Sequence, residues 1–309
     1  TGKIFPNQYV MLIGSPGTRK SSAVKTARKL LGTTGYQSFA AEKTTKEKFL
    51  LDLEGSDEDL FVTTHGRPGA SKNSITAADV LANLDLAPSG DAHDGIPREV
   101  FIVADEFNDF AGTGNLDFLS MLGVLWDWDD EDTTYKQRFK NTKSISIFQP
   151  TVSILSGNTH AGFKLAFPEQ ALGQGFLSRL VLVHSEPSGK KVSFPKPPPA
   201  GVADALKERL TQIRETVRGA AVRSKEAEQA LDTIYRTFKD LEDYRFNSYS
   251  SRRYTHLLKL CLLVAAMRLS TTVELKDVIL ANSILTYTES SMPKALGEFG
   301  RSKDSDAQH

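Results

Sequence analysis

Short apolar runs recur between residues 9 and 185 of the chain, and polar segments with helical periodicity lie between them. Runs of this length are typical of buried strands. We expect strands at 9–13, 36–40, 59–64, 98–105, 151–157 and 179–185. The segment 20–31 places Ala23, Ala27 and Leu30 at helical spacing. This alternation predicts an α/β fold with a largely parallel sheet that is covered on both faces.

A stretch rich in proline, glycine and lysine at 186–201 interrupts this pattern and predicts a boundary. After it, apolar positions recur at helical spacing. We expect helices within 202–217, 225–246, 254–269 and 274–291. The chain therefore divides into a core at 1–187, a linker at 188–201, a helical C-terminal domain at 202–296 and a flexible tail at 297–309.

Composition narrows the possible partners. The 309 residues carry 38 basic and 38 acidic side chains, so the formal net charge is zero and nucleic-acid binding would depend on a local patch. Cys261 is the only cysteine, which excludes an internal disulfide and fits a cytoplasmic protein. No apolar run is long enough to span a membrane. Because the chain begins with Thr-Gly, we expect it to be part of a longer polypeptide.

The octapeptide GSPGTRKS at 14–21 lies between the first predicted strand and the first predicted helix. It nearly matches the P-loop pattern G-x-x-x-x-G-K-[ST], in which backbone N–H groups at a helix N-terminus surround phosphates. The residues expected to bind nucleotide are Gly14, Ser15, Pro16, Gly17, Thr18, Arg19, Lys20 and Ser21. Lys20 would reach the β- and γ-phosphates of ATP, and Ser21 would ligate Mg²⁺. Arg19 replaces the second glycine, and the sequence leaves open whether that position needs a positive φ.

A second feature with the same chemistry is the apolar strand that ends in Asp105 and Glu106. In a Walker B strand, the first carboxylate holds Mg²⁺ and the second polarises the attacking water. The alternative is that the two carboxylates only end a strand at the surface. Their position downstream of a phosphate loop favours the Walker B interpretation.

Three further positions are candidates for ATP hydrolysis. Asn158 directly follows the predicted strand at 151–157 and is suited to orient water, although a turn residue is the alternative. Arg179 opens the next strand and is suited to reach a γ-phosphate in a neighbouring subunit, with a salt bridge inside the subunit as the alternative. Either Arg252 or Arg253 is expected to contact nucleotide from the helical domain, and a plain surface arginine is equally compatible. His160 is the histidine expected near the nucleotide.

These parts follow one another in the order found in AAA+ ATPases, which the chain resembles over roughly residues 5–292. More narrowly, it resembles the helicase domains of phage and mobile-element replication proteins, which are often fused to a primase and are similar to superfamily 3 and MCM-type helicases. The segments that carry this likeness are ITAADVLANL, FKNTKSISIFQPTVSILSGNTH, QGFLSRLVLV and RRYTHLLKLCLLVAA.

The resemblance implies a P-loop AAA+ core followed by an all-helical lid, in a ring of six subunits with ATP and Mg²⁺ bound between neighbours. It also implies that Lys20, Glu106, Asn158 and Arg179 carry out hydrolysis. Arg19 departs from the family pattern and leaves nucleotide affinity in question. A primase or DNA-binding domain in the same full-length chain is a further expected partner.

The segment 133–148 predicts a hairpin with basic and aromatic side chains interleaved. Lys136, Arg138, Lys140 and Lys143 are the candidate contacts to single-stranded DNA, because cations neutralise phosphates and rings stack on bases. The alternative is a solvated hairpin that protects a sheet edge. In a ring, several weak patches facing one channel would act together.

The function expected from these features is an ATP-driven, hexameric DNA helicase or translocase of a phage or mobile-element replication protein. Its expected location is the cytoplasm, which is the bacterial host cytosol if the protein is phage-encoded. The main alternative is an AAA+ protein remodeller or helicase loader whose ATPase is governed by a protein partner. A nucleotide-binding scaffold that hydrolyses little ATP is a third possibility.

Overall fold

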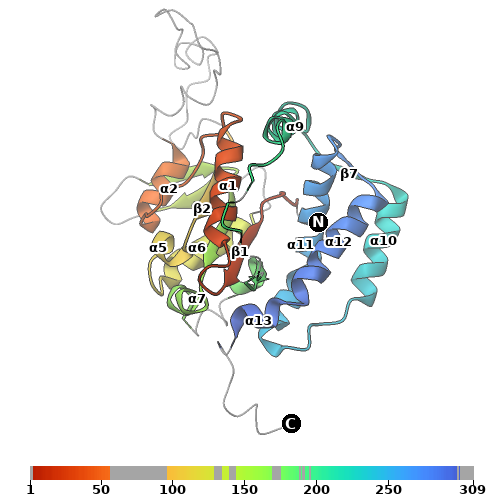
Figure 1. Ribbon diagram of the computed structural model, residues 1–309. Coiled ribbons are helices and arrows are strands. Elements are labelled where there is room, and N and C mark those ends of the chain that lie inside the picture. Colours follow the sequence, from red (N-terminus) through yellow and green to blue (C-terminus); the bar gives the residue numbers. More distant parts are fainter. Residues whose placement is uncertain are drawn as a thin grey trace, which may run out of the picture.

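A computed structural model describes residues 3–55, 96–128, 134–138, 144–168, 175–187, 189, 192–194, 196–297 and 299 (Figure 1). The strand expected at 59–64 and the motif ITAADVLANL lie outside the described residues.

The centre of the molecule is a four-stranded sheet in which every pairing is parallel, in the order β2-β5-β1-β6. Its strands are β1 (Tyr9–Gly14), β2 (Glu99–Ala104), β5 (Thr151–Asn158) and β6 (Leu180–Ser185). The predicted α/β class with a parallel sheet is therefore confirmed. The strand expected at 36–40 is reduced to a single parallel bridge between Phe39 and Phe101. The backbone hydrogen bonds from this run to β2 all involve Phe101.

Alternate residues of β1 face two different apolar clusters, as the pleat of a strand requires. Tyr9, Met11 and Ile13 are buried in the larger cluster, which the sheet shares with the helices of the first half of the chain and with C-terminal residues such as Tyr249 and Leu296. Val10 packs against the smaller cluster, which contains Val181 of β6 and residues of the C-terminal helices. The C-terminal helices therefore cover part of one face of the sheet.

The helices that the structure describes in the first half of the chain lie beside the sheet (Figure 1). They are α1 (Lys20–Gly32), α2 (Lys46–Glu54), α5 (Phe107–Ala111), α6 (Leu116–Trp126) and α7 (His160–Ala166). Side chains of Thr45, Asn115 and Thr159 cap three of them by accepting a backbone N–H.

The C-terminal region is mainly helical, as predicted. Its helices are α9 (Val202–Thr216), α10 (Lys225–Thr237), α11 (Asn247–Met267), α12 (Leu275–Glu289) and α13 (Met292–Leu296). Two short strands, β7 (Val222–Arg223) and β8 (Thr272–Val273), pair between them. The helix expected within 225–246 ends at Thr237, and α11 begins at Asn247, so Arg252 and Arg253 lie inside α11.

The predicted hairpin is present as β3 (Thr134–Gln137) and β4 (Ile145–Phe148), which pair antiparallel. Its connection, with Lys140 and Lys143, lies outside the described residues. Among the helices that the structure describes, none has the length and apolar character needed to cross a membrane.

Candidate functional site

The carboxyl ends of three adjacent strands bring the candidate residues together. Gly14 ends β1, Asn158 ends β5, and Asp105 and Glu106 directly follow β2. Because β5 lies between β1 and β2 and all three are parallel, these ends meet at one edge of the sheet. A Cβ added to Gly157 would lie 2.7 Å from the backbone oxygen of Asp105 and 3.4 Å from Lys20 Cβ. The edge is therefore tightly packed at the point where the loop meets the acidic segment.

Lys20 is folded back onto its own loop. Its Nζ donates hydrogen bonds to the carbonyl oxygens of Gly14 at 2.7 Å and Ser15 at 2.9 Å, and to Thr18 Oγ1 at 3.1 Å. Burial lowers the pKa of Lys20, and the nearby charge of Glu106 opposes that shift. The ammonium group is thus held at the mouth of the loop, at the start of α1, where a phosphate would meet it.

Arg19 has a left-handed backbone, with φ 63° and ψ 23°. It is the N-cap residue of α1, and its side chain makes no capping hydrogen bond. The position that is glycine in the P-loop pattern thus needs a positive φ here, which costs a non-glycine residue about 1–2 kcal/mol. The question that the sequence leaves open is answered: the loop keeps this conformation at the cost of strain.

The two carboxylates at the end of β2 have different surroundings. Asp105 forms an ion pair of 2.8 Å with Lys25 Nζ, from the second turn of α1. Glu106 is the N-cap residue of α5 and makes no side-chain capping bond. The sequence did not predict this role of Lys25, because an exposed lysine on α1 looks the same whether or not it pairs with a carboxylate that follows β2.

The oxygen donors of Ser21 and Asp105 are of the type that Mg²⁺ prefers. Ser21 lies in the first turn of α1, and the close approach of Gly157 to both Asp105 and Lys20 keeps α1 near the acidic segment. The donor set therefore fits a magnesium ion bound partly through water. Among the described residues, no group of three or more His, Cys, Asp or Glu side chains is placed to hold a metal without such help.

Asn158 is fully buried, at 0% exposure. Neither its Oδ1 nor its Nδ2 has a hydrogen-bond partner within the described part of the chain, and the same holds for Oδ1 of Asn108. A Cβ on Gly162 would lie 2.3 Å from Asn158 Oδ1, so α7 packs directly on the amide. A buried polar group without a hydrogen-bond partner lowers the free energy of unfolding by about 1–3 kcal/mol. An asparagine that only formed an exposed turn would not carry this cost. Such groups in native proteins call for a functional or solvent explanation.

No protein-family model matches the sequence, and no curated protein matches it significantly.

The last helix of the C-terminal region also reaches the carboxyl edge. His160 Nδ1 lies 3.1 Å from the carbonyl oxygen of Ala295 in α13, and its ring lies 5.7 Å from that of His184. Lys294 forms an ion pair of 3.0 Å with Glu186. Burial, followed by the charge of His160, lowers the pKa of His184. His160 thus lies at the predicted edge, whereas nothing in the sequence pointed to Lys294.

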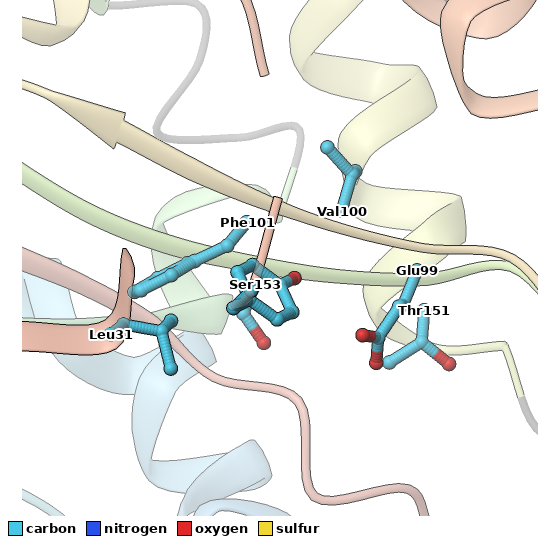
Figure 2. A pocket seen from close by; sticks show the side chains of 7 residues that line it. Leu31, Glu99, Val100, Phe101, Thr151 and Ser153 are labelled. Carbon is cyan, nitrogen blue, oxygen red and sulfur yellow. The ribbon is translucent and has the colours of Figure 1, made fainter. Parts of the chain in front are cut away.

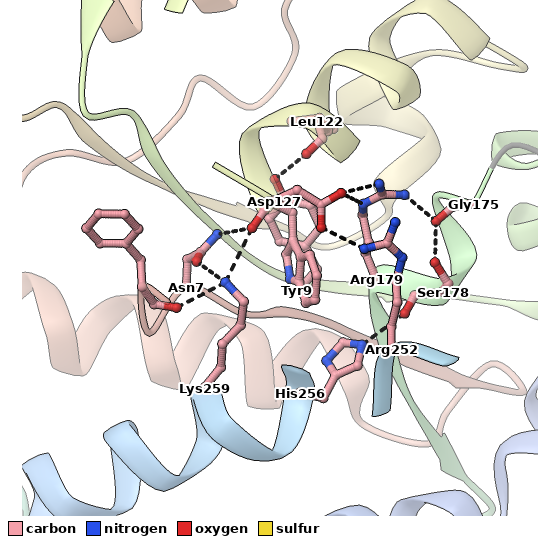
Figure 3. A network of polar contacts seen from close by, with 12 residues as sticks. Asn7, Tyr9, Leu122, Asp127, Gly175, Ser178, Arg179, Arg252, His256 and Lys259 are labelled. Atoms are coloured by element: carbon pink, nitrogen blue, oxygen red, sulfur yellow. Dashed lines mark hydrogen bonds and ion pairs between the residues drawn. The ribbon is translucent and has the colours of Figure 1, made fainter. Parts of the chain in front are cut away.

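Arg179 lies at the opposite end of the parallel strands, which we call the amino edge of the sheet. It directly precedes β6, whose first residue pairs with Tyr9 and whose last pairs with Gly14. Five residue steps of about 3.3 Å separate Leu180, the residue after Arg179, from Ser185, so the backbone next to Arg179 lies about 17 Å along the strand from the level of Gly14. There it forms an ion pair with Asp127, which also accepts a hydrogen bond of 2.7 Å from Arg252 (Figure 3). The structure thus contains the intramolecular salt bridge that was the alternative for Arg179.

The structure does not bring Arg252 or Arg253 to the loop of the same chain. Arg252 lies with Arg179 on Asp127. Arg253 is buried and binds both carboxylate oxygens of Glu289, while its guanidinium lies 4.4 Å from the ring centre of Phe238. Arg253 therefore joins helices of the C-terminal region.

The hairpin joins the amino edge as well. Arg98 N, just before β2, donates to the carbonyl oxygen of Phe148 in β4, and Glu54 of α2 accepts a hydrogen bond of 2.8 Å from Ser146 N. Lys136 and Arg138 are exposed on the strand β3 and just after it. The hairpin and Asn158 are therefore at opposite ends of β5.

The cavity in Figure 2 is separate from the carboxyl edge. It has a volume of about 230 Å³, and its lining residues are Leu31, Tyr36, Glu99, Val100, Phe101, Thr151 and Ser153. Burial raises the pKa of both Tyr36 and Glu99. The cavity lies at the beginning of β2 and β5 and at the far end of α1, so it is not the predicted nucleotide site.

Proposed function

We propose that this chain is an ATP-hydrolysing motor of the AAA+ type, with a P-loop core and a helical lid, that works as a ring on single-stranded DNA. The observation that carries the proposal is the carboxyl edge, where β1, β5 and β2 present a phosphate loop, a buried amide and two carboxylates side by side. Sequence segments more than 50 residues apart supply these groups. A chance P-loop match would not predict that convergence.

In this proposal, the chain's own groups divide the work of hydrolysis. Backbone N–H groups of the 14–21 loop and the N-terminus of α1 bind the phosphates, and Lys20 exchanges its loop carbonyls for phosphate oxygens. Ser21 and Asp105 would hold Mg²⁺, which neutralises phosphate charge when bound. Glu106 orients and polarises the attacking water, and Asn158 supplies a hydrogen bond to that water once the edge opens.

Hydrolysis then needs a second copy of the chain, because the backbone next to Arg179 lies about 17 Å along the strand from the level of Gly14 in its own subunit. An arginine supplied by a neighbour stabilises charge at the γ-phosphate. A ring in which each amino edge faces the next carboxyl edge would complete every site. This is the arrangement expected from the resemblance to AAA+ helicases.

Strand β5 offers a route from the nucleotide to DNA. Two residues separate it from the hairpin strand β4, and it ends at Asn158. A shift at the nucleotide edge would therefore be transmitted along one strand to the hairpin with Lys136 and Arg138. Lys140 and Lys143 belong to the same proposed DNA contact.

The test is steady-state ATP hydrolysis by the purified chain, with and without single-stranded DNA, beside the variant Glu106→Gln. We expect hydrolysis that DNA stimulates several-fold and that falls at least 100-fold in Glu106→Gln, because the variant keeps the shape of the side chain but cannot polarise water. Nucleotide binding should persist in that variant.

Two results would contradict the motor. Hydrolysis that ignores DNA would favour a protein remodeller or loader. Tight nucleotide binding without hydrolysis, under conditions where the chain assembles, would favour a scaffold.

A further inference from the structure

Two arginines from different elements share one carboxylate at the amino edge of the sheet (Figure 3). Arg179, just before β6, donates from Nε and Nη2 to Oδ2 of Asp127. Arg252, in α11, donates from Nη1 to Oδ1 of the same residue. Each oxygen of Asp127 therefore fixes a different guanidinium, and the two arginines are held side by side.

The charges in this cluster do not cancel. Two guanidinium groups and one carboxylate leave an excess of one positive charge. Asp127 is also the C-cap residue of α6, where the helix dipole disfavours a negative side chain. Its carboxylate is thus better explained by the two arginines it holds than by the stability of α6. A cluster of this kind has electrostatic capacity for a further anion.

The two arginines differ in how much of each is available to such an anion. All three nitrogens of Arg179 are engaged, since Nη1 donates to the carbonyl oxygen of Gly175 at 2.5 Å, and its side chain is 12% exposed. Arg252 has a side chain that is 34% exposed, and among the described residues its one hydrogen-bond partner is Asp127. Arg252 is therefore the more accessible donor, and Arg179 is the more buried of the two.

We infer that Asp127 is a positioning residue that sets Arg252 beside Arg179, so that the two guanidiniums together bind the terminal phosphate of a nucleotide held by an adjacent copy of the chain. The inference rests on the proposed function. Arg252 then contacts nucleotide bound to the next subunit, and not nucleotide bound to its own. The reason is that Arg179 and Arg252 both lie too far from the 14–21 loop of their own chain to reach it.

The first measurement is the kcat and KM for ATP of Arg252→Ala and Asp127→Asn. We expect kcat to fall at least ten-fold in both, with KM within two-fold of wild type, because each chain's own phosphate loop is untouched. The matched control is Asp232→Asn, which removes a carboxylate from the exposed pair with Arg236 on α10 and should leave kcat unchanged.

The second measurement mixes Arg252→Ala with Lys20→Ala, each of which should be nearly inactive alone. One subunit then supplies an intact loop and the other supplies intact arginines, so the mixture should hydrolyse ATP well above the sum of its parts. Arg252→Ala is the deciding variant, because its partly exposed side chain can be removed without a large loss of packing, even if Asp127→Asn proves unstable.

Wild-type kcat in Arg252→Ala would overturn the inference. So would a low kcat that mixing fails to restore, which would mean that Arg252 acts within its own chain. Both results are compatible with an active wild type and leave the proposed function intact. Absence of hydrolysis by the wild type would instead overturn both.

Discussion

At the scale of single residues, Arg19 shows that a departure from a motif need not change the backbone. Its φ of 63° is the conformation that glycine adopts without strain. The sequence identified the substitution but not its effect, because φ depends on how the loop closes onto α1. Gly17, two residues earlier, has a φ of 84° and meets the same requirement without strain.

We expect Arg19→Gly to raise the free energy of unfolding by about 0.5–1 kcal/mol, since relief of strain exceeds the entropy that glycine adds to the unfolded chain. Chemical denaturation measures this directly. Arg19→Ala is the matched control: it removes the same exposed side chain but keeps the Cβ, so it should give no gain. Equal stabilities of the two variants would show that backbone strain is not the cause.

At the scale of elements, α11 holds the C-terminal region against the sheet through buried polar groups. His256 is fully buried, with Nε2 2.9 Å from the carbonyl oxygen of Ser178 and Nδ1 3.3 Å from Gln8 Oε1. Lys259, three residues further on, donates to the carbonyl oxygens of Phe5 at 3.0 Å and Trp126 at 3.3 Å (Figure 3). The amphipathic pattern predicted this helix, but its polar contacts depend on strands and loops more than 70 residues away.

Acid should weaken this attachment, because burial lowers the pKa of His256 to about 4. Between pH 6.5 and 4 the unfolded chain takes up a proton at this residue and the folded chain does not, so the free energy of unfolding falls as the pH falls, by about 3 kcal/mol in total. Denaturation of wild type and His256→Gln at several pH values isolates the effect, since only the wild type titrates there. A stability difference that stays constant with pH would contradict it.

At the scale of the whole molecule, local patterns predicted the parallel sheet, the hairpin and the carboxyl-edge residues, because each signal lies within a short stretch such as 98–106 or 151–158. The pairs Lys25–Asp105 and Arg252–Asp127 could not be predicted in this way. Their partners come from different elements, and an exposed lysine or arginine on a helix looks the same whether or not it has one. The length of α11 was also underestimated, since polar residues fill its first two turns.

DNA binding is a prediction at this scale, because it depends on several hairpins acting together. We expect Lys136→Ala combined with Arg138→Ala to abolish DNA stimulation of ATP hydrolysis while changing the DNA-free rate less than two-fold. Affinity for single-stranded DNA should fall steeply with salt in the wild type and less steeply in the variant, because fewer phosphates are neutralised. Fluorescence anisotropy at several salt concentrations measures both slopes. Identical slopes would place the DNA contact elsewhere.

The separation of Arg179 from Gly14 along the strands has a further consequence for assembly. If the proposed function holds, the arginines of one subunit meet the loop of the next, and we expect the copies to associate head to tail. An open row of n copies then has n − 1 complete sites and a closed ring has n. Closure thus adds a working site without adding a subunit, and an isolated chain has none.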